Sequence, residues 1–140
     1  MITIARVALA AACLTTAACT PPSPRNEIRA WTDSLSFTVT ADPTPPHARE
    51  RTLYKVVVRD RDSGQPIERW EGQIFASTRE GANVYDPLLP GPELGTYYGT
   101  LNYIIAGEWA VAIRMRPDST RPFQRVDWMQ EVLGERPGTS

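Results

Sequence analysis

The 140-residue sequence is poor in the side chains that most often carry chemistry, with two cysteines and one histidine. Both cysteines, Cys13 and Cys19, stand near the N-terminus. The rest of the chain therefore has no thiol for a disulfide, a thiolate metal site or a nucleophile. His47 stands among prolines without a constellation of partner residues, and we interpret it as an exposed loop residue.

Concentrated positive charge is also missing. The formal net charge is -1 and the charges are spread evenly along the chain, so no basic stripe is available to meet the phosphates of a nucleic acid. Lysine occurs once, as Lys55, on the expected solvent side of a strand, whereas a catalytic lysine is buried away from water. The sequence thus predicts neither nucleic-acid binding nor a serine–lysine enzyme.

No apolar run at the N-terminus is long enough to cross a bilayer. The run at 7–12 follows the single early cation Arg6, as in a secretion signal. Residues 14–19, LTTAAC, resemble the lipobox of bacterial lipoproteins, in which small residues precede a cysteine that becomes the first residue after cleavage and carries the lipid. Cys13 is a rival site, and an ordinary signal cleaved nearby is the alternative.

The lipobox resemblance implies that residues 1–18 are a signal peptide and that Cys19 carries acyl chains such as palmitate. Residues 19–33 would then form a proline-rich tether that holds a domain off the membrane. Thr20 favours sorting to the outer membrane. The expected location is the bacterial cell envelope, with the lipid-anchored protein facing the periplasm.

From residue 34 onward, apolar and polar residues alternate, which is typical of half-buried strands. We predict strands over 34–40, 53–60, 72–78, 95–103, 109–116 and 123–131. For the last segment, a helix over 127–133 is the alternative. Residues 79–94 contain prolines and glycines that break both kinds of element, so a long loop is predicted there.

Residues 95–116 are predicted to form two adjacent strands joined by a turn at 106–108. Their apolar side would supply the structural core, with Trp109 as its plug: Tyr97, Leu101, Tyr103, Trp109, Val111 and Ile113. The opposite side of the second strand is predicted to be solvated: Ala110, Ala112, Arg114 and Arg116.

Strands with one apolar face need a second sheet, and short strands separated by turn residues favour an immunoglobulin-like fold. We therefore predict an all-β, antiparallel β-sandwich of about six or seven strands. It would span residues 34–133, and a flexible tail would follow at 134–140.

Several short motifs occur in a particular order: Gly64-x-Pro66-Ile67, Pro87-Leu88, Gly95-x-Tyr97-x-Gly99, and Gly107-Glu108-Trp109. In this order they resemble the YtkA-like and FixH-like envelope domains, whose fold is an immunoglobulin-like β-sandwich. Some of those relatives handle copper or assist assembly of membrane oxidases, with Met and His in the loop before the G-x-Y strand. Residues 79–94 contain neither residue, so we expect no metal and no cofactor.

Other candidate groups have plain structural interpretations. Residues 60–64, DRDSG, differ from a calcium loop in the place of the glycine, and we interpret them as a charged turn. Glu108 and Asp118 could be imagined as an acid–base pair, but solvated turns account for them without one. Met115 alternates inward as core filler. No catalytic residue is predicted, and the chain is not expected to be an enzyme.

Five aromatic side chains are not all assignable to the core pattern: Trp31, Trp70, Phe75, Tyr85 and Tyr98. Of these, Tyr85, Tyr98 and Trp70 are the candidates for partner binding. Exposed aromatic groups are common in partner-binding surfaces, although packing beneath the long loop is the alternative. The sequence predicts a non-catalytic, lipid-anchored envelope module that binds a protein partner. The second hypothesis is an accessory role in copper or other metal trafficking or oxidase assembly.

Overall fold

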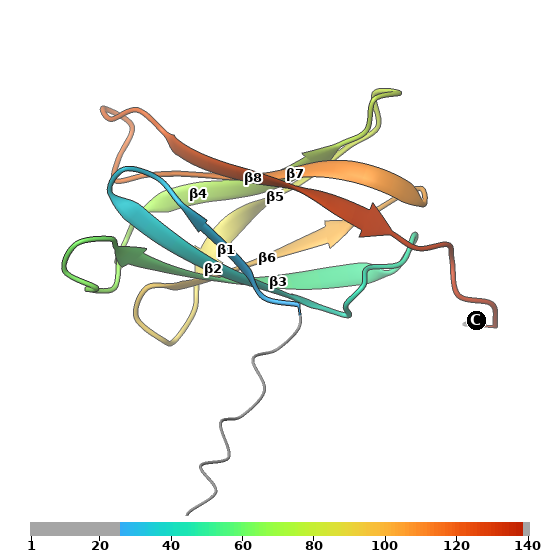
Figure 1. The fold of residues 1–140 in the computed structure, drawn as a ribbon, viewed down its shortest axis with the longest axis horizontal. Helices are drawn as coiled ribbons and strands as arrows, with labels where there is room; N and C mark the ends of the chain where they lie inside the picture. Colours follow the sequence, from blue (N-terminus) through green and yellow to red (C-terminus); the bar gives the residue numbers. More distant parts are fainter. Residues whose placement is uncertain (1–25, 139–140) are drawn as a thin grey trace, which may run out of the picture.

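The computed structural model describes residues 26–138, which fold into eight antiparallel strands joined by turns and loops. The predicted all-β fold is confirmed, with one or two strands more than expected (Figure 1). The predicted signal peptide and the Cys19 anchor lie outside the described residues. In the described part, no helix has the length and apolarity to cross a membrane. The strands are β1 (Ile28–Trp31), β2 (Leu35–Asp42), β3 (Arg51–Asp60), β4 (Glu71–Ser77), β5 (Asn83–Pro90), β6 (Thr96–Asn102), β7 (Gly107–Arg116) and β8 (Gln124–Val132).

The strands follow the spatial order β1-β2-β3-β6-β5-β4-β7-β8. Figure 1 shows two facing layers, with β1, β2, β3 and β6 in the lower layer and β4, β7 and β8 in the upper one. Strand β1 begins at Ile28, inside the segment that we assigned to the tether. It adds an edge strand to β2, where Ala30 pairs with Phe37.

Strand β5 joins the two layers, and it corrects the prediction of a long loop at 79–94. Residues 83–88 pair with β4, whereas Leu89 and Pro90 pair with Tyr98 and Tyr97 of β6. Proline lacks an amide hydrogen and is confined within sheets to ends, edges and bulges. Pro87 and Pro90 stand where β5 changes partner, which is why a sequence typical of a loop forms a strand.

The prediction of a hairpin over 95–116 is wrong in its pairing, although both strands exist. Strand β6 pairs with β3 and β5, and β7 pairs with β4 and β8. The connection between them crosses from one layer to the other, and the Trp109 indole N–H donates to the Ile105 carbonyl at 3.0 Å. Two strands with apolar sides can face each other across a core as well as lie side by side.

Strand β8 closes the sandwich at both of its ends. Near its start, the side-chain amide oxygen of Gln124 accepts hydrogen bonds from the hydroxyls of Thr32 and Ser34. At its end, Leu133 exchanges backbone hydrogen bonds with Pro46 and Ala48, both at 2.9 Å. The helix considered for 127–133 does not form, because β8 continues through Val132.

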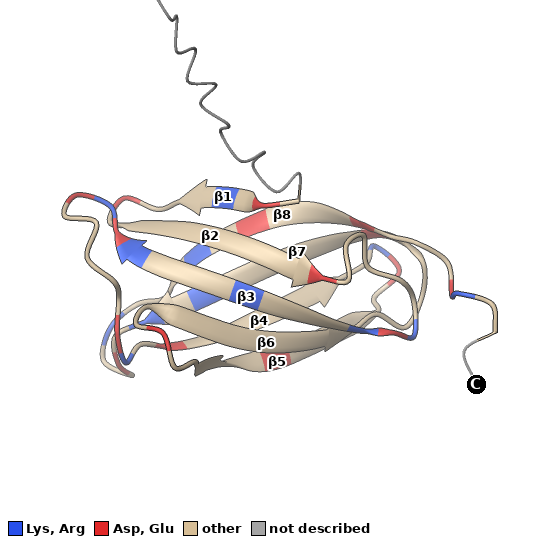
Figure 2. Cartoon of the chain, turned by 90° about the horizontal axis from the view of Figure 1, so that it is seen from below, with Lys and Arg blue, Asp and Glu red and all other residues tan. Residues whose placement is uncertain are grey.

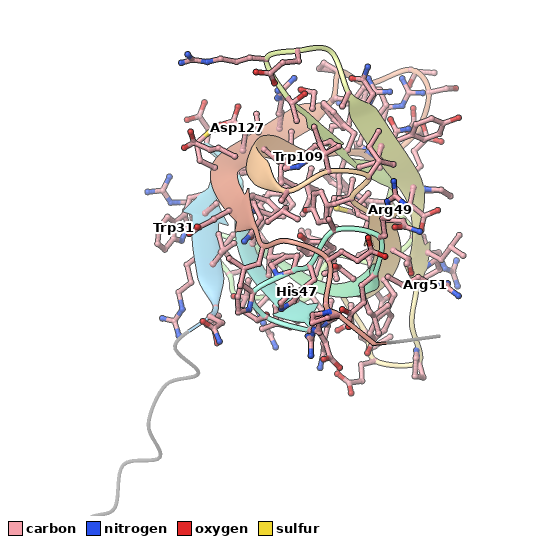
Figure 3. All side chains as sticks on the ribbon, turned by 90° about the vertical axis from the view of Figure 1, so that its right-hand side faces the viewer. Trp31, His47, Arg49, Arg51, Trp109 and Asp127 are labelled. Atoms are coloured by element: carbon pink, nitrogen blue, oxygen red, sulfur yellow. The ribbon has the colours of Figure 1, made fainter. Side chains whose placement is uncertain are left out.

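The interior is built from the alternating residues of both layers. Trp109 is completely buried between them, whereas Asp127 and Trp31 lie on the outside (Figure 3). All six predicted core residues are at most 1% exposed. The prediction that Ala112 is solvated is wrong. Ala112 is 2% exposed because its short side chain lies between Phe75 and Asp127 of the neighbouring strands.

Four aromatic residues meet in the core. The Tyr54 and Tyr103 hydroxyls are hydrogen-bonded to each other. Tyr103 packs on Trp109, and Tyr54 packs on Trp128 with ring centroids 6.4 Å apart. Desolvation raises the pKa of Tyr54 to about 12, against a smaller opposing effect of its hydrogen bond. Burial raises the pKa of Tyr103 as well, and the adjacent Tyr54 raises it further by a smaller amount.

Candidate functional site

The three aromatic residues proposed for partner binding do not lie together. Tyr85 points outward from the upper layer and is 72% exposed. Trp70 is partly buried against the core, and its backbone N–H donates to the Tyr97 hydroxyl. Tyr98 lies on the outside of the lower layer, opposite Lys55 and Leu89 on the adjacent strands. Of the three, Tyr85 is the one presented freely to a partner.

The chain itself covers Tyr98. A side chain at Gly91 would place its first carbon 2.3 Å from the Tyr98 ring, so the segment after β5 passes directly over that ring. Glycine is required at such a close approach because any larger residue would clash. Tyr98 is therefore packed beneath the chain rather than open to a partner.

The outer face of the upper layer carries a cluster of arginine and aromatic side chains that sequence reasoning did not assemble. We call this surface the Arg–Phe face. It combines the outward residues of β4, β5, β7 and β8 with one residue from the turn before β8: Glu71, Gln73, Phe75, Tyr85, Arg114, Arg116, Phe123, Arg125, Asp127 and Met129.

Three guanidinium groups of this face lie over its two phenylalanine rings. The Arg114 guanidinium carbon is 4.6 Å from the centre of the Phe123 ring and 5.7 Å from that of Phe75. The corresponding distance is 4.1 Å from Arg116 to Phe123 and 5.0 Å from Arg125 to Phe75. These are cation–π distances, and they hold the arginines in place on a sheet surface open to water.

The acidic residues of the face neutralise the three arginines unequally. Glu71 forms an ion pair and a hydrogen bond with Arg116. Asp127 is 3.6 Å from Arg125, and both side chains are more than half exposed, so this pair contributes little. Arg114 donates to the neutral Gln73 amide oxygen, from Nε at 3.1 Å and from Nη2 at 2.8 Å. Positive charge therefore remains on the face.

Register places Arg114 directly opposite Arg125 on the antiparallel strands β7 and β8. Like charges directly opposite one another destabilise a sheet pair. The sequence shows the two arginines, but only the register of β8 on β7 reveals that they are neighbours.

Two shallow hollows adjoin Arg114. One of about 310 Å³ lies between Phe75, Tyr85 and Arg114. Another of about 260 Å³ lies between Pro87, Arg114 and Phe123. Arg114 lines both hollows, so a ligand seated in either one would contact its guanidinium.

The outer face of the lower layer is different in character. Figure 2 shows that β2 and β6 are almost without charge and that β3 carries basic residues. The sequence of β3 includes Lys55. Lys55 lies 3.6 Å from Glu93. The exposed apolar residues of this layer include Trp31, Leu53 and Leu89, which stand on three separate strands, and Leu89 lies opposite Tyr98.

A third hollow, of about 790 Å³, lies at one end of the molecule. It is bounded by residues 77–80 of the β4–β5 turn and residues 105–108 of the connection between β6 and β7. Its apolar groups include Ile105 and Met129, which are 44% and 59% exposed. Glu108 lines this hollow, but Asp118 does not, so the hollow does not combine the two acids considered as an acid–base pair.

The residues considered for metal binding have other roles. His47 Nδ1 is hydrogen-bonded to the Gly134 carbonyl at 2.9 Å, beside the backbone bridge to Leu133. Met115 is fully buried. Among the described residues, no group of three His, Cys, Asp or Glu side chains is placed to hold a metal ion.

The turn at 60–64 is held by its own acidic residue. The Asp60 carboxylate accepts hydrogen bonds from the Ser63 amide at 2.9 Å, the Ser63 hydroxyl at 3.1 Å and the Asp62 amide at 3.0 Å. These hydrogen bonds hold the pKa of Asp60 below its usual value, and the two from Ser63 have a larger effect than the one from Asp62. This carboxylate stabilises a turn.

No protein-family model matches the chain, and no curated protein matches it either. Among solved structures, it is similar to a DUF4426 family protein from Pseudomonas aeruginosa PAO1, with 13% identity and a TM-score of 0.60. That match covers 79% of this chain and 98% of the other.

A second similar structure is FetP of uropathogenic Escherichia coli strain F11, expressed in the periplasm, with 10% identity and a TM-score of 0.58. The match covers 79% of this chain and 96% of FetP, and a copper-bound FetP variant matches with a TM-score of 0.57. The Lin-41 filamin domain matches at 19% identity and a TM-score of 0.50, over 73% of this chain and 93% of the domain. The chain thus shares an immunoglobulin-like β fold with proteins from which its sequence differs almost completely.

Proposed function

We propose that this protein is a non-catalytic accessory module of the bacterial cell envelope that binds a protein partner on its Arg–Phe face. The observation that carries the proposal is the composition of this face. Arginine and aromatic residues are enriched at the energetic centres of protein interfaces. Here Tyr85 is exposed, and Phe75 and Arg114 lie beside it around one hollow.

The proposed location rests on two observations. Residues 14–19 resemble a lipobox, and the similar FetP protein was produced in the periplasm. We propose that Cys19 is acylated and anchors the domain so that it faces the periplasm. A Cys19→Ala variant is then expected to move from the membrane fraction to the soluble fraction and to lose labelling by radioactive palmitate. Retention of both properties would contradict the anchor.

Photo-crosslinking of the full-length protein in cells tests the binding surface. Benzoylphenylalanine in place of Tyr85 is expected to give a discrete adduct with a partner. The matched control carries it in place of Leu53, which is 45% exposed on the outside of the opposite layer. Equal adducts at both positions, or none at Tyr85, would contradict the proposal.

Copper handling is the second candidate, because one similar structure is a copper-bound FetP variant. Soft copper sites use thioether, imidazole or thiolate ligands. In residues 26–138, the histidine ring is bonded to a backbone carbonyl and Met115 is buried. Met129 is 59% exposed, so it is the one open thioether among these residues. Anaerobic titration of the protein with Cu(I) separates the two candidates, since our proposal expects no binding tighter than micromolar.

A further inference from the structure

The outward pair of Arg114 and Arg125 is an electrostatic conflict that the fold does not need. The two residues are direct cross-strand partners on β7 and β8. Any polar residue satisfies an outward position of a sheet, whereas two cations facing each other repel. Local conflicts of this kind are concentrated at functional sites, where a ligand resolves them.

The pair is also held ready for a ligand. Gln73 fixes one edge of the Arg114 guanidinium through Nε and Nη2, and Phe123 supports its plane. Nη1 of Arg114 donates to no acceptor among the described residues. The Arg125 side chain is 56% exposed, and its Nε lies 3.6 Å from the Asp127 carboxylate, beyond normal hydrogen-bond distance. Both groups therefore have donors to offer.

We infer that Arg114 and Arg125 together bind a carboxylate from an acidic segment of the partner protein. This inference rests on the proposed function and specifies the partner's chemistry. A carboxylate between the two guanidinium groups would accept charge-assisted hydrogen bonds and cancel their repulsion. The hollow beside Phe75 and Tyr85 would receive an apolar side chain next to the acid.

Charge complementarity and shape favour a peptide segment. Glu71 is occupied by Arg116, and Asp127 lies beside Arg125, so the uncompensated cation is Arg114, near the end of β7. It lines hollows on both sides. An extended segment with apolar residues two places before and after an acidic residue presents all three side chains on one face. It would place the acid at Arg114 and the two apolar side chains in the hollows.

Fluorescence anisotropy of a labelled peptide tests this inference with the full-length protein in detergent. The probe peptide carries a glutamate with a phenylalanine two places before it and another two places after it, separated by serines. Its control contains glutamine in place of the glutamate. We expect saturable binding of the glutamate peptide that weakens as salt is raised, since exposed charges are screened. Equal binding of the glutamine peptide would overturn the inference.

Variants locate the site. Arg114→Gln and Arg125→Gln are each expected to weaken binding by about tenfold, because each removes charge-assisted donors. Arg51→Gln, on an exposed position of β3 in the other layer, is the matched control and is expected to have no effect. An equal loss in Arg51→Gln would overturn the inference. Melting temperatures of the Arg125 variant no lower than that of the parent would show that binding is lost without unfolding.

Two further measurements are needed. The first distinguishes a carboxylate ligand from a phosphate ligand, and the second distinguishes failure of the acidic-segment inference from failure of the proposed function. Binding to phosphatidylglycerol vesicles that depends on Arg114, without binding of the glutamate peptide, would overturn the inference in favour of a phosphate ligand. A crosslink at Tyr85 that persists in the Arg114→Gln and Arg125→Gln variants would overturn the acidic-segment inference alone. Absence of any crosslink at Tyr85 would instead overturn the proposed function.

Discussion

Tyr103 packs edge-on against Trp109, with 5.1 Å between ring centroids and an interplanar angle of 68°. The two residues stand at either end of the connection that carries the chain from β6 in one layer to β7 in the other. Edge-to-face aromatic pairs of this kind contribute about 0.5–1.5 kcal/mol beyond the area that they bury. The contact therefore ties the two layers together where the chain passes between them.

Replacing Trp109 by alanine is expected to destabilise the domain by about 3–5 kcal/mol, because the indole is fully buried and leaves a large cavity. That loss approaches the whole stability of a domain of this size, roughly 5–15 kcal/mol. Urea denaturation followed by far-ultraviolet circular dichroism measures the change. A variant that melts within a few degrees of the parent would show that Trp109 is not central.

The two buried indole N–H groups allow a matched comparison. Trp109 Nε1 donates to the Ile105 carbonyl, whereas Trp128 Nε1 is buried without a partner in residues 26–138. Phenylalanine at 109 breaks a hydrogen bond, while phenylalanine at 128 removes an unsatisfied donor, and an unsatisfied buried group costs about 1–3 kcal/mol. We expect Trp109→Phe to lower the free energy of unfolding more than Trp128→Phe does. The reverse order in denaturant titrations would contradict this account.

Stability is expected to fall at alkaline pH because of the buried tyrosines. In the unfolded chain, tyrosine loses its proton near pH 10, whereas desolvation raises the pKa of Tyr54 to about 12 and raises that of Tyr103 as well. Between these values the unfolded state binds fewer protons, so the free energy of unfolding decreases as pH rises, by up to about 1.4 kcal/mol per pH unit for each tyrosine.

Urea midpoints measured from pH 9 to pH 12 test this dependence. A Tyr54→Phe variant is the control, and its stability is expected to fall less steeply because one titrating group is gone. A midpoint that stays constant across this range in the parent protein would contradict the burial of the pair.

Alanine substitutions at Gly95 and Gly64 distinguish the energetic cost of backbone strain from that of a steric clash. Both have positive φ angles, 72° and 73°. A side chain at Gly95 would lie 2.7 Å from Pro66 and 2.9 Å from the Val58 carbonyl, whereas nothing lies within 4 Å at Gly64. Alanine at 64 is expected to cost about 1–2 kcal/mol from strain alone, and alanine at 95 more than that. Thermal melts of the two variants compare them directly.

The alternation pattern predicted the core strands well, since Leu35, Phe37 and Val39 are each 1% exposed. Alternation reports which side of a strand is buried and carries no information on which strand lies next to it. For this reason both β6 and β7 were predicted, but their pairing was not. Strand β5 was missed because Pro87 and Pro90 are local signals for a loop, and tertiary pairing outweighs them.

The Arg–Phe face could not be predicted from the sequence for a related reason. Arg114 and Arg116 were predicted to point outward, and both are partly exposed. Phe75 comes from a segment distant from Arg125, and the register of β4, β7 and β8 brings these two residues to the same surface. Phe123, in the turn before β8, lies against Arg114 and Arg116. A search for arginines at outward positions of separate predicted strands is the signal that could have suggested it.

Strand β5 gives the domain a mechanical property. Its first residues belong to the ladder of β4 and its last two to the ladder of β6, so neither layer can peel away while the other keeps its hydrogen bonds. Melting one ladder pulls on the next, and the molecule is expected to come apart in a single cooperative step rather than as two sheets in turn.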